Sequence, residues 1–165
     1  MKTLLRKSLK LVTASLLIAG AAMIANAQDA RLQLDQLDVL ASRAKETVDV
    51  QIDGRTMDTF GGFDKELLKG VKGIYVKVFT FEKEGQYTPA EVESVLAQLR
   101  GPNWSRLVAV KSRNSENVTF YVNQVGDQIK GLVVLSLEPK EIVVVNILGP
   151  VDLNKLKERG LEGIL

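Results

Sequence analysis

The chain has 165 residues, with 22 Lys and Arg against 20 Asp and Glu, and it has neither His nor Cys. These counts exclude a Ser-His-Asp triad, a Cys nucleophile, disulfide bonds and zinc sites built from Cys and His. A formal net charge of +2 is too small to indicate nucleic-acid binding, and 45% hydrophobic with 25% charged residues is an ordinary globular composition.

The first 27 residues have the pattern of a secretory signal peptide. A basic start, with four Lys and Arg and no acid, precedes the apolar run Leu11–Ile24 and the small-residue cleavage pattern Ala25-Asn26-Ala27. The apolar run is shorter than the roughly 20 residues that span a bilayer, which favours a signal over a membrane anchor. We therefore expect cleavage after Ala27. The product would be a periplasmic or secreted chain over residues 28–165, with 18 basic and 20 acidic residues and no membrane span.

The first half of this chain predicts helices and strands in alternation. Apolar residues at helical spacing predict an amphipathic helix from Leu32 to Lys45. Strict alternation predicts a half-buried strand over Thr47–Ile52, and β-branched and aromatic residues predict another over Gly73–Glu82. Between them, Arg55–Gly70 predicts one or two short helices, broken at Gly61-Gly62.

The second half predicts one helix and then a run of strands. Thr88, Pro89 and Glu91 form a capping box with a first-turn proline, and the helix stops at Gly101-Pro102. Four strands with short connections follow, and short connections make neighbouring strands antiparallel. We expect them at Arg106–Ser112, Val118–Val125, Gln128–Leu137 and Glu141–Leu148, with Asp152 capping a last short helix. The predicted class is α+β: a mostly antiparallel sheet of five or six strands, ending in this four-strand meander, with helices on one face of a single domain.

Two segments of the meander are apolar on both strand faces, Gly131–Leu135 and Ile142–Leu148. Burial on both faces requires a cover on each side of the sheet. One hypothesis is that another chain or a hydrophobic ligand covers part of the second face. The alternative is that the helices and the long Arg55–Gly70 segment cover it.

Few residues suggest chemistry. The pairs Asp35/Asp38 and Asp49/Asp53 could serve acid–base hydrolysis or hold a cation, although the ordinary interpretation is a solvated helix face and a turn residue. Lys77 lies among apolar neighbours in a strong strand, where a desolvated amine can become a base or a nucleophile. The ordinary reading is a polar residue of an alternating strand, with its amine in water. No cofactor or metal site is predicted.

The strands also carry a resemblance. The segments LDQLDVLASRAKETVDVQIDG (Leu34–Gly54), KGIYVKVFTFE (Lys72–Glu82) and VGDQIKGLVVLSLEPKEIVVVNILGPVDL (Val125–Leu153) resemble the bacterial domain-of-unknown-function family DUF4252. The resemblance implies an exported protein of a Gram-negative envelope, in a setting of envelope-stress signalling, with no established activity. Many members of the family are lipoproteins, whereas this chain has Ala27-Gln28 where a lipobox Cys would stand.

We therefore expect an exported, non-enzymatic binding or interaction module. Its partner would be an envelope protein or a second copy of the chain. Two alternatives stay open: a hydrolase that uses only Asp, Glu or Lys, and a carrier of a hydrophobic small molecule. The candidate interaction surface comprises Phe60, Phe63, Lys77, Phe79 and Phe81.

Overall fold

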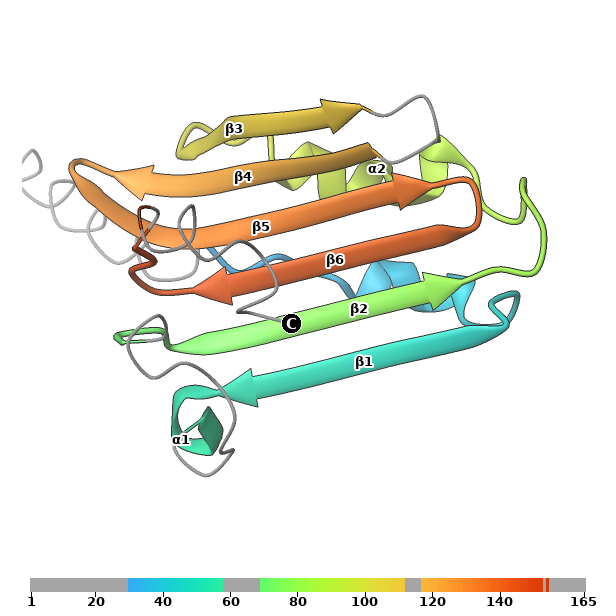
Figure 1. Cartoon of the computed structure of the whole chain (residues 1–165), viewed down its shortest axis with the longest axis horizontal. Helices are drawn as coiled ribbons and strands as arrows, with labels where there is room; N and C mark the ends of the chain where they lie inside the picture. Colours follow the sequence, from blue (N-terminus) through green and yellow to red (C-terminus); the bar gives the residue numbers. More distant parts are fainter. Residues whose placement is uncertain (1–29, 58–68, 112–116, 153, 155–165) are drawn as a thin grey trace, which may run out of the picture.

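The computed structural model describes residues 30–57, 69–111, 117–152 and 154, and all structural statements below concern these residues. They form a six-stranded antiparallel sheet in the order β1-β2-β6-β5-β4-β3 (Figure 1). The helices are η1 (Asp35–Leu40, a 3-10 helix), α1 (Gly54–Met57) and α2 (Pro89–Gln98). The strands are β1 (Glu46–Asp53), β2 (Gly73–Thr80), β3 (Trp104–Lys111), β4 (Asn117–Val125), β5 (Gln128–Glu138) and β6 (Glu141–Leu148).

The α+β class and the C-terminal meander are confirmed. Strands β3 to β6 pair in sequence order, and β6 then pairs with β2, so that the meander joins the β1–β2 pair. Each observed strand begins and ends within about two residues of its predicted bounds, as expected for hydrogen-bond-based assignments. The order in which the two parts of the sheet join was not predictable from the local pattern.

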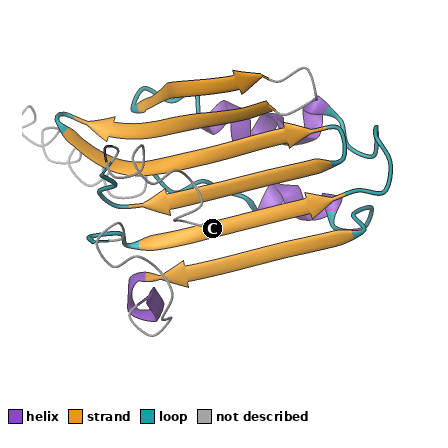
Figure 2. Cartoon of the chain, in the orientation of Figure 1, coloured by secondary structure: helices purple, strands orange, loops and turns teal. Residues whose placement is uncertain are grey.

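Helices η1 and α2 lie on the same side of the sheet, which we call the helix face (Figure 2). Phe79, on β2, and Val144, on β6, point from the strands into the core beneath these helices. The buried residues of this core are Leu32, Leu34, Leu37, Leu40, Phe79, Phe81, Val92, Val95, Leu99, Val133, Leu135, Ile142 and Val144.

The helix predicted from Leu32 to Lys45 is wrong in type and extent, because only Asp35–Leu40 is helical and it is a 3-10 helix. Residues i and i+3 of a 3-10 helix lie on the same side, which places Leu37 and Leu40 together in the core. The preceding segment is held outside the helix by side-chain amides. Asn146 accepts a hydrogen bond from the Leu32 N–H (2.9 Å) and donates one to the Ala30 carbonyl (2.9 Å).

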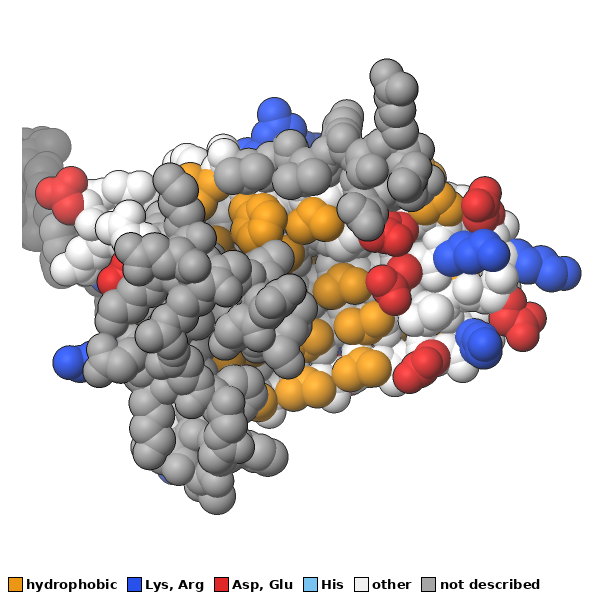
Figure 3. All heavy atoms as spheres, viewed as in Figure 1, with side chains coloured by type: hydrophobic (Ala, Val, Ile, Leu, Met, Phe, Trp, Pro, Cys, Tyr) orange, Lys and Arg blue, Asp and Glu red, His pale blue; other side chains and the backbone are white. Residues whose placement is uncertain are grey.

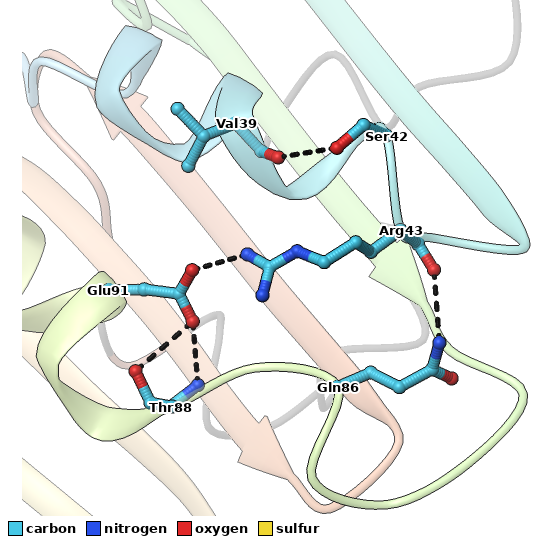
Figure 4. Close-up of polar contacts among 6 residues, drawn as sticks. All are labelled: Val39, Ser42, Arg43, Gln86, Thr88 and Glu91. Carbon is cyan, nitrogen blue, oxygen red and sulfur yellow. Dashed lines mark hydrogen bonds and ion pairs between the residues drawn. The ribbon is translucent and has the colours of Figure 1, made fainter.

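Polar contacts tie α2 to the chain between η1 and β1 (Figure 4). The Glu91 carboxylate accepts hydrogen bonds from the Thr88 N–H (2.9 Å) and hydroxyl (3.1 Å), which confirms the predicted capping box. The same carboxylate forms an ion pair with Arg43. These contacts hold the pKa of Glu91 below its usual range, the hydrogen bond from Arg43 being the largest cause.

Three further predictions fall wholly or partly outside the described residues. Of the Arg55–Gly70 segment, the structure shows the short α1, and residues 58–68 are not described. Of the last predicted helix it shows Asp152, whose carboxylate accepts a hydrogen bond from the Asn154 N–H (3.0 Å). The predicted signal peptide lies outside the described residues entirely.

Candidate functional site

Lys77 is the centre of a cluster of charged groups on the helix face. It lies in the middle of β2 and is only 4% exposed, although it is a lysine. The antiparallel register places Asp49 of β1 directly opposite, and its carboxylate lies 3.1 Å from the Lys77 amine. Asp38 of η1 forms a second ion pair with the same amine. One buried cation is thus shared by carboxylates from two other elements.

The electrostatics of this cluster oppose catalysis by Lys77. Burial by itself lowers the pKa of the amine, but the hydrogen bonds to Asp38 and Asp49 outweigh it, and the pKa is raised above its ordinary value. A base or Schiff-base nucleophile near neutral pH needs a lowered pKa instead. The amine therefore stays protonated and acts as a tie between η1, β1 and β2.

A small cleft of about 40 Å³ lies beside this cluster, between residues 31–35 and the first two strands. Its wall includes Gln51, Asp49 and Tyr75, and the Arg31 guanidinium lies over the Tyr75 ring, 4.3 Å from the ring centre. That volume holds a water molecule or two. Pockets for organic ligands measure roughly 300–1,000 Å³, so this cleft is too small for a metabolite.

The structure pairs carboxylates differently from the sequence prediction. It brings together Asp38 and Asp49, which come from different elements, around Lys77. Asp53 instead accepts hydrogen bonds from the Thr56 N–H (2.8 Å) and hydroxyl (2.6 Å), which lower the pKa of Asp53. Asp53 is therefore a turn residue, as its ordinary interpretation from the sequence predicted. Among the described residues, no group of three or more Asp and Glu is placed to hold a metal ion.

Of the five residues predicted as an interaction surface, Phe79 and Phe81 fill the core and are almost completely buried. The Phe81 ring stacks on Tyr87 at 5.4 Å between centres. Lys77 is held in the ion-pair cluster, and Phe60 and Phe63 lie outside the described residues. Two of the four Phe rings of the predicted surface are thus occupied in packing.

The opposite side of the sheet is the more exposed apolar surface. We define the valine face by Val48, Val50, Val76, Val78, Val143 and Val145, which point to one side because they are paired across β1, β2 and β6. Val48 and Val50 are 37% and 36% exposed, and Val76, Val78 and Val143 are half-buried. Figure 3 shows apolar side chains gathered across these strands. Within the described residues, η1 and α2 both pack on the other face.

The valine face extends the apolar character that the sequence pattern indicated for β5 and β6. Beside it, on the same side of the sheet, lies a buried cluster made of Ile52, Val71, Ile74, Leu132, Val134, Val145, Ile147 and Val151. Sequence reasoning missed that Val48 and Val50 continue this surface to the outer strand. The alternation in β1 was visible, but its position at the edge depends on the strand order.

A larger hollow, of about 640 Å³, lies at the far ends of β4, β5 and β6. Lys72, Asp127 and Lys130 line it together with apolar residues such as Leu148 and Pro150. Its walls include the chain at Ala30, next to residues that are not described.

No helix within the described part of the chain is long and apolar enough to cross a membrane.

Comparison with known proteins gives one finding. A family model described as "Domain of unknown function (DUF4252)" matches residues 41–158, more than two thirds of the chain. The match includes every strand of the sheet and α2, and it begins just after η1. No curated protein matches the chain.

Proposed function

Since the chain belongs to this DUF4252 family of unknown function, we propose that the domain is an exported, non-enzymatic module that binds an envelope protein through its valine face. The observation that carries the proposal is the exposure of Val48 and Val50 beside the half-buried Val76, Val78 and Val143. Contiguous apolar surface of this kind on a folded domain is typical of an interaction site.

The charged groups support a binding role over catalysis. Lys77, the one cation that the sequence singled out, is neutralised by Asp38 and Asp49 and has a raised pKa. The cleft beside it is too small for a metabolite. A hydrolase that uses Asp, Glu or Lys would need a shifted carboxylate or amine beside room for its substrate. A role in envelope-stress signalling stays a prediction from the family resemblance.

The proposal of export depends on the pattern of the first 27 residues, and an expression experiment can test it directly. The protein, expressed from its full sequence in a Gram-negative host, should be recovered from the periplasmic fraction with Gln28 as its first residue. Intact mass and N-terminal sequencing read this out. A chain that retains residues 1–27 and stays with the cytoplasm or inner membrane would contradict export.

Binding is tested by crosslinking in living cells with a photoreactive residue at Val143, on the valine face, or at Val39. Val39 is 61% exposed and lies on η1, across the sheet from the valine face, so it is the matched control. We expect one envelope protein to be captured at Val143 and absent at Val39. Capture of nothing at Val143, or of the same proteins at both positions, would contradict the proposal.

A further inference from the structure

The two edges of the sheet are built differently. At β3, the register with β4 shifts between Arg106 and Val108, so that Leu107 forms a bulge. At β1, all eight residues pair with β2 in an unbroken register, and the strand contains neither Pro nor a basic residue. Every residue of β1 except Ile52 is exposed.

Edge strands expose backbone N–H and C=O groups that can pair with another chain. Natural proteins usually protect such edges with bulges, with charged side chains (lysine above all) or with proline. The edge at β3 has such protection in its bulge and in Arg106. The edge at β1 has no bulge, no Pro and no basic residue, its charges are the carboxylates of Glu46, Asp49 and Asp53, and no described residue pairs with its outer side. The contrast within one sheet points to β1 as an edge kept open for pairing.

The side chains of β1 define what an added strand must carry. On the valine face, Val48 and Val50 offer an apolar neighbour to every second residue of an added strand. On the helix face, Asp49 is 42% exposed, and Asp38 nearby is 60% exposed. These two carboxylates share the single cation of Lys77, so the cluster keeps an excess negative charge that faces solvent beside the edge.

The excess negative charge beside β1 also determines which kind of strand can pair with this edge. A second copy paired through its own β1 would bring together two strands that each carry Glu46, Asp49 and Asp53 and no basic residue. Like charges facing each other across a strand pair are destabilising. A partner strand with a Lys or Arg beside Asp49 would instead complete the charge of the cluster.

We propose that β1 is a strand-addition site for an extended segment of a partner protein, in which apolar and cationic side chains alternate. The apolar side chains lie beside Val48 and Val50, and a cationic one lies beside Asp49. Main-chain hydrogen bonds supply affinity, and the alternation supplies specificity. This inference rests on the proposed binding function and names the chemistry and the binding mode of its partner.

The test uses the exported chain and a synthetic seven-residue peptide in which Val and Lys alternate. Amide hydrogen exchange, measured by NMR, should show the β1 amides of the protein protected by about tenfold or more when the peptide is bound. The same peptide with Glu in place of Lys should bind at least about tenfold more weakly at low salt, because its charge is repelled. A backbone N-methylated Val-Lys peptide should not bind, because its donors are removed.

Matched variants locate the site. Val50→Lys places a charge on the edge, and Val125→Lys changes an equally exposed valine (36%) at the end of β4, away from β1. We expect Val50→Lys to abolish peptide binding and Val125→Lys to leave it unchanged, with cooperative unfolding kept in both. A peptide with Gln in place of Lys tests the role of Asp49. Asp49→Asn should reduce the preference for the Lys peptide over this Gln peptide severalfold, without abolishing binding.

Several outcomes would overturn the inference. One is slow exchange at all β1 amides in the free protein, which would show that this chain itself covers the edge. Others are equal binding of the Lys and Glu peptides, equal loss in both Val→Lys variants, or concentration-dependent dimers removed by Val50→Lys. If Val143 captures an envelope protein in cells and Val50→Lys does not weaken that capture, the binding function stands and the strand-addition mode falls.

Discussion

At the residue scale, the environment of Lys77 combines a buried side-chain stem with a charged amine that needs ion-pair partners. The strand places its stem between apolar neighbours, and only the two carboxylates make a charged amine tolerable there. Because both carboxylates are exposed, Asp38 to 60% and Asp49 to 42%, they can lose Lys77 and remain hydrated. Lys77 has no such freedom, since without them its charge is buried and unpaired. Removal of Lys77 should therefore cost less free energy of unfolding than removal of both carboxylates.

This difference predicts a small effect for one variant and a large effect for another. Lys77→Met should change the free energy of unfolding by no more than about 1 kcal/mol, whereas the double variant Asp38→Asn, Asp49→Asn should lower it by about 3 kcal/mol at neutral pH. Urea unfolding monitored by circular dichroism measures both. An equal loss in the two variants would show that packing of the lysine stem, and not its charge, dominates.

The same pair of variants predicts a pH dependence. In the wild type the pKa of Lys77 is raised above its ordinary value of 10.5, so its contribution is fully present below pH 10.5 and is lost as the pH rises through the raised pKa. In the double Asn variant, burial acts alone and lowers the pKa of Lys77. Its stability should therefore increase as the pH rises from 8 to 10, while that of the wild type stays flat over this interval with respect to Lys77.

At the scale of elements, the chain before η1 is an irregular segment held in place by side-chain amides. Asn146 of β6 bonds to Ala30 and Leu32, and Gln98 of α2 accepts from the Gln33 N–H (2.8 Å) and donates to its carbonyl (3.0 Å). Close packing adds to this, because a Cβ on Gly131 would lie 2.9 Å from the Ala30 Cβ. These contacts explain why the predicted long helix does not begin at Leu32.

Removal of the buried amide should release this segment. Asn146→Leu leaves the Leu32 N–H and the Ala30 carbonyl without their partner, which should cost about 2 kcal/mol and accelerate hydrogen exchange at the Leu32 amide. Gln98→Ala is the control, since its partner Gln33 is exposed and water can replace the amide. Unchanged exchange at Leu32 in Asn146→Leu would show that packing alone holds the segment.

At the scale of the whole molecule, β6 is the element on which the two halves of the sheet depend. It lies between β2 and β5, and it joins the β1–β2 pair to the meander although β2 and β6 are far apart in sequence. Both of its faces are buried, Ile142 and Val144 on the helix face and Val145 and Ile147 on the other. Such long-range pairing must form before either core is complete.

A chain that ends at residue 140, and so lacks β6, should therefore lose cooperative folding. We expect it to show no sigmoidal urea transition and to lose the near-ultraviolet circular dichroism of its packed aromatic residues. The full chain is the reference. A cooperative transition in the shortened chain would mean that the strands before β6 form a core of their own.

Local patterns determined much of this protein. Alternation in β1 and β2, the capping box of α2 and the short turns of the meander predicted these elements, because hydrophobic periodicity and turn chemistry act over a few residues. The absence of His and Cys likewise narrowed the possible chemistry before any fold was known.

Only the tertiary structure decided which residues meet. The pairing of β2 with β6 places β1 at an edge, turns Lys77 into the shared partner of Asp38 and Asp49, and sends Phe79 and Phe81 into the core. These contacts join elements distant in the chain, so no local spacing encodes them. The same physical reason explains the 3-10 helix η1, because the amides of Asn146 and Gln98 compete with helix formation from across the fold.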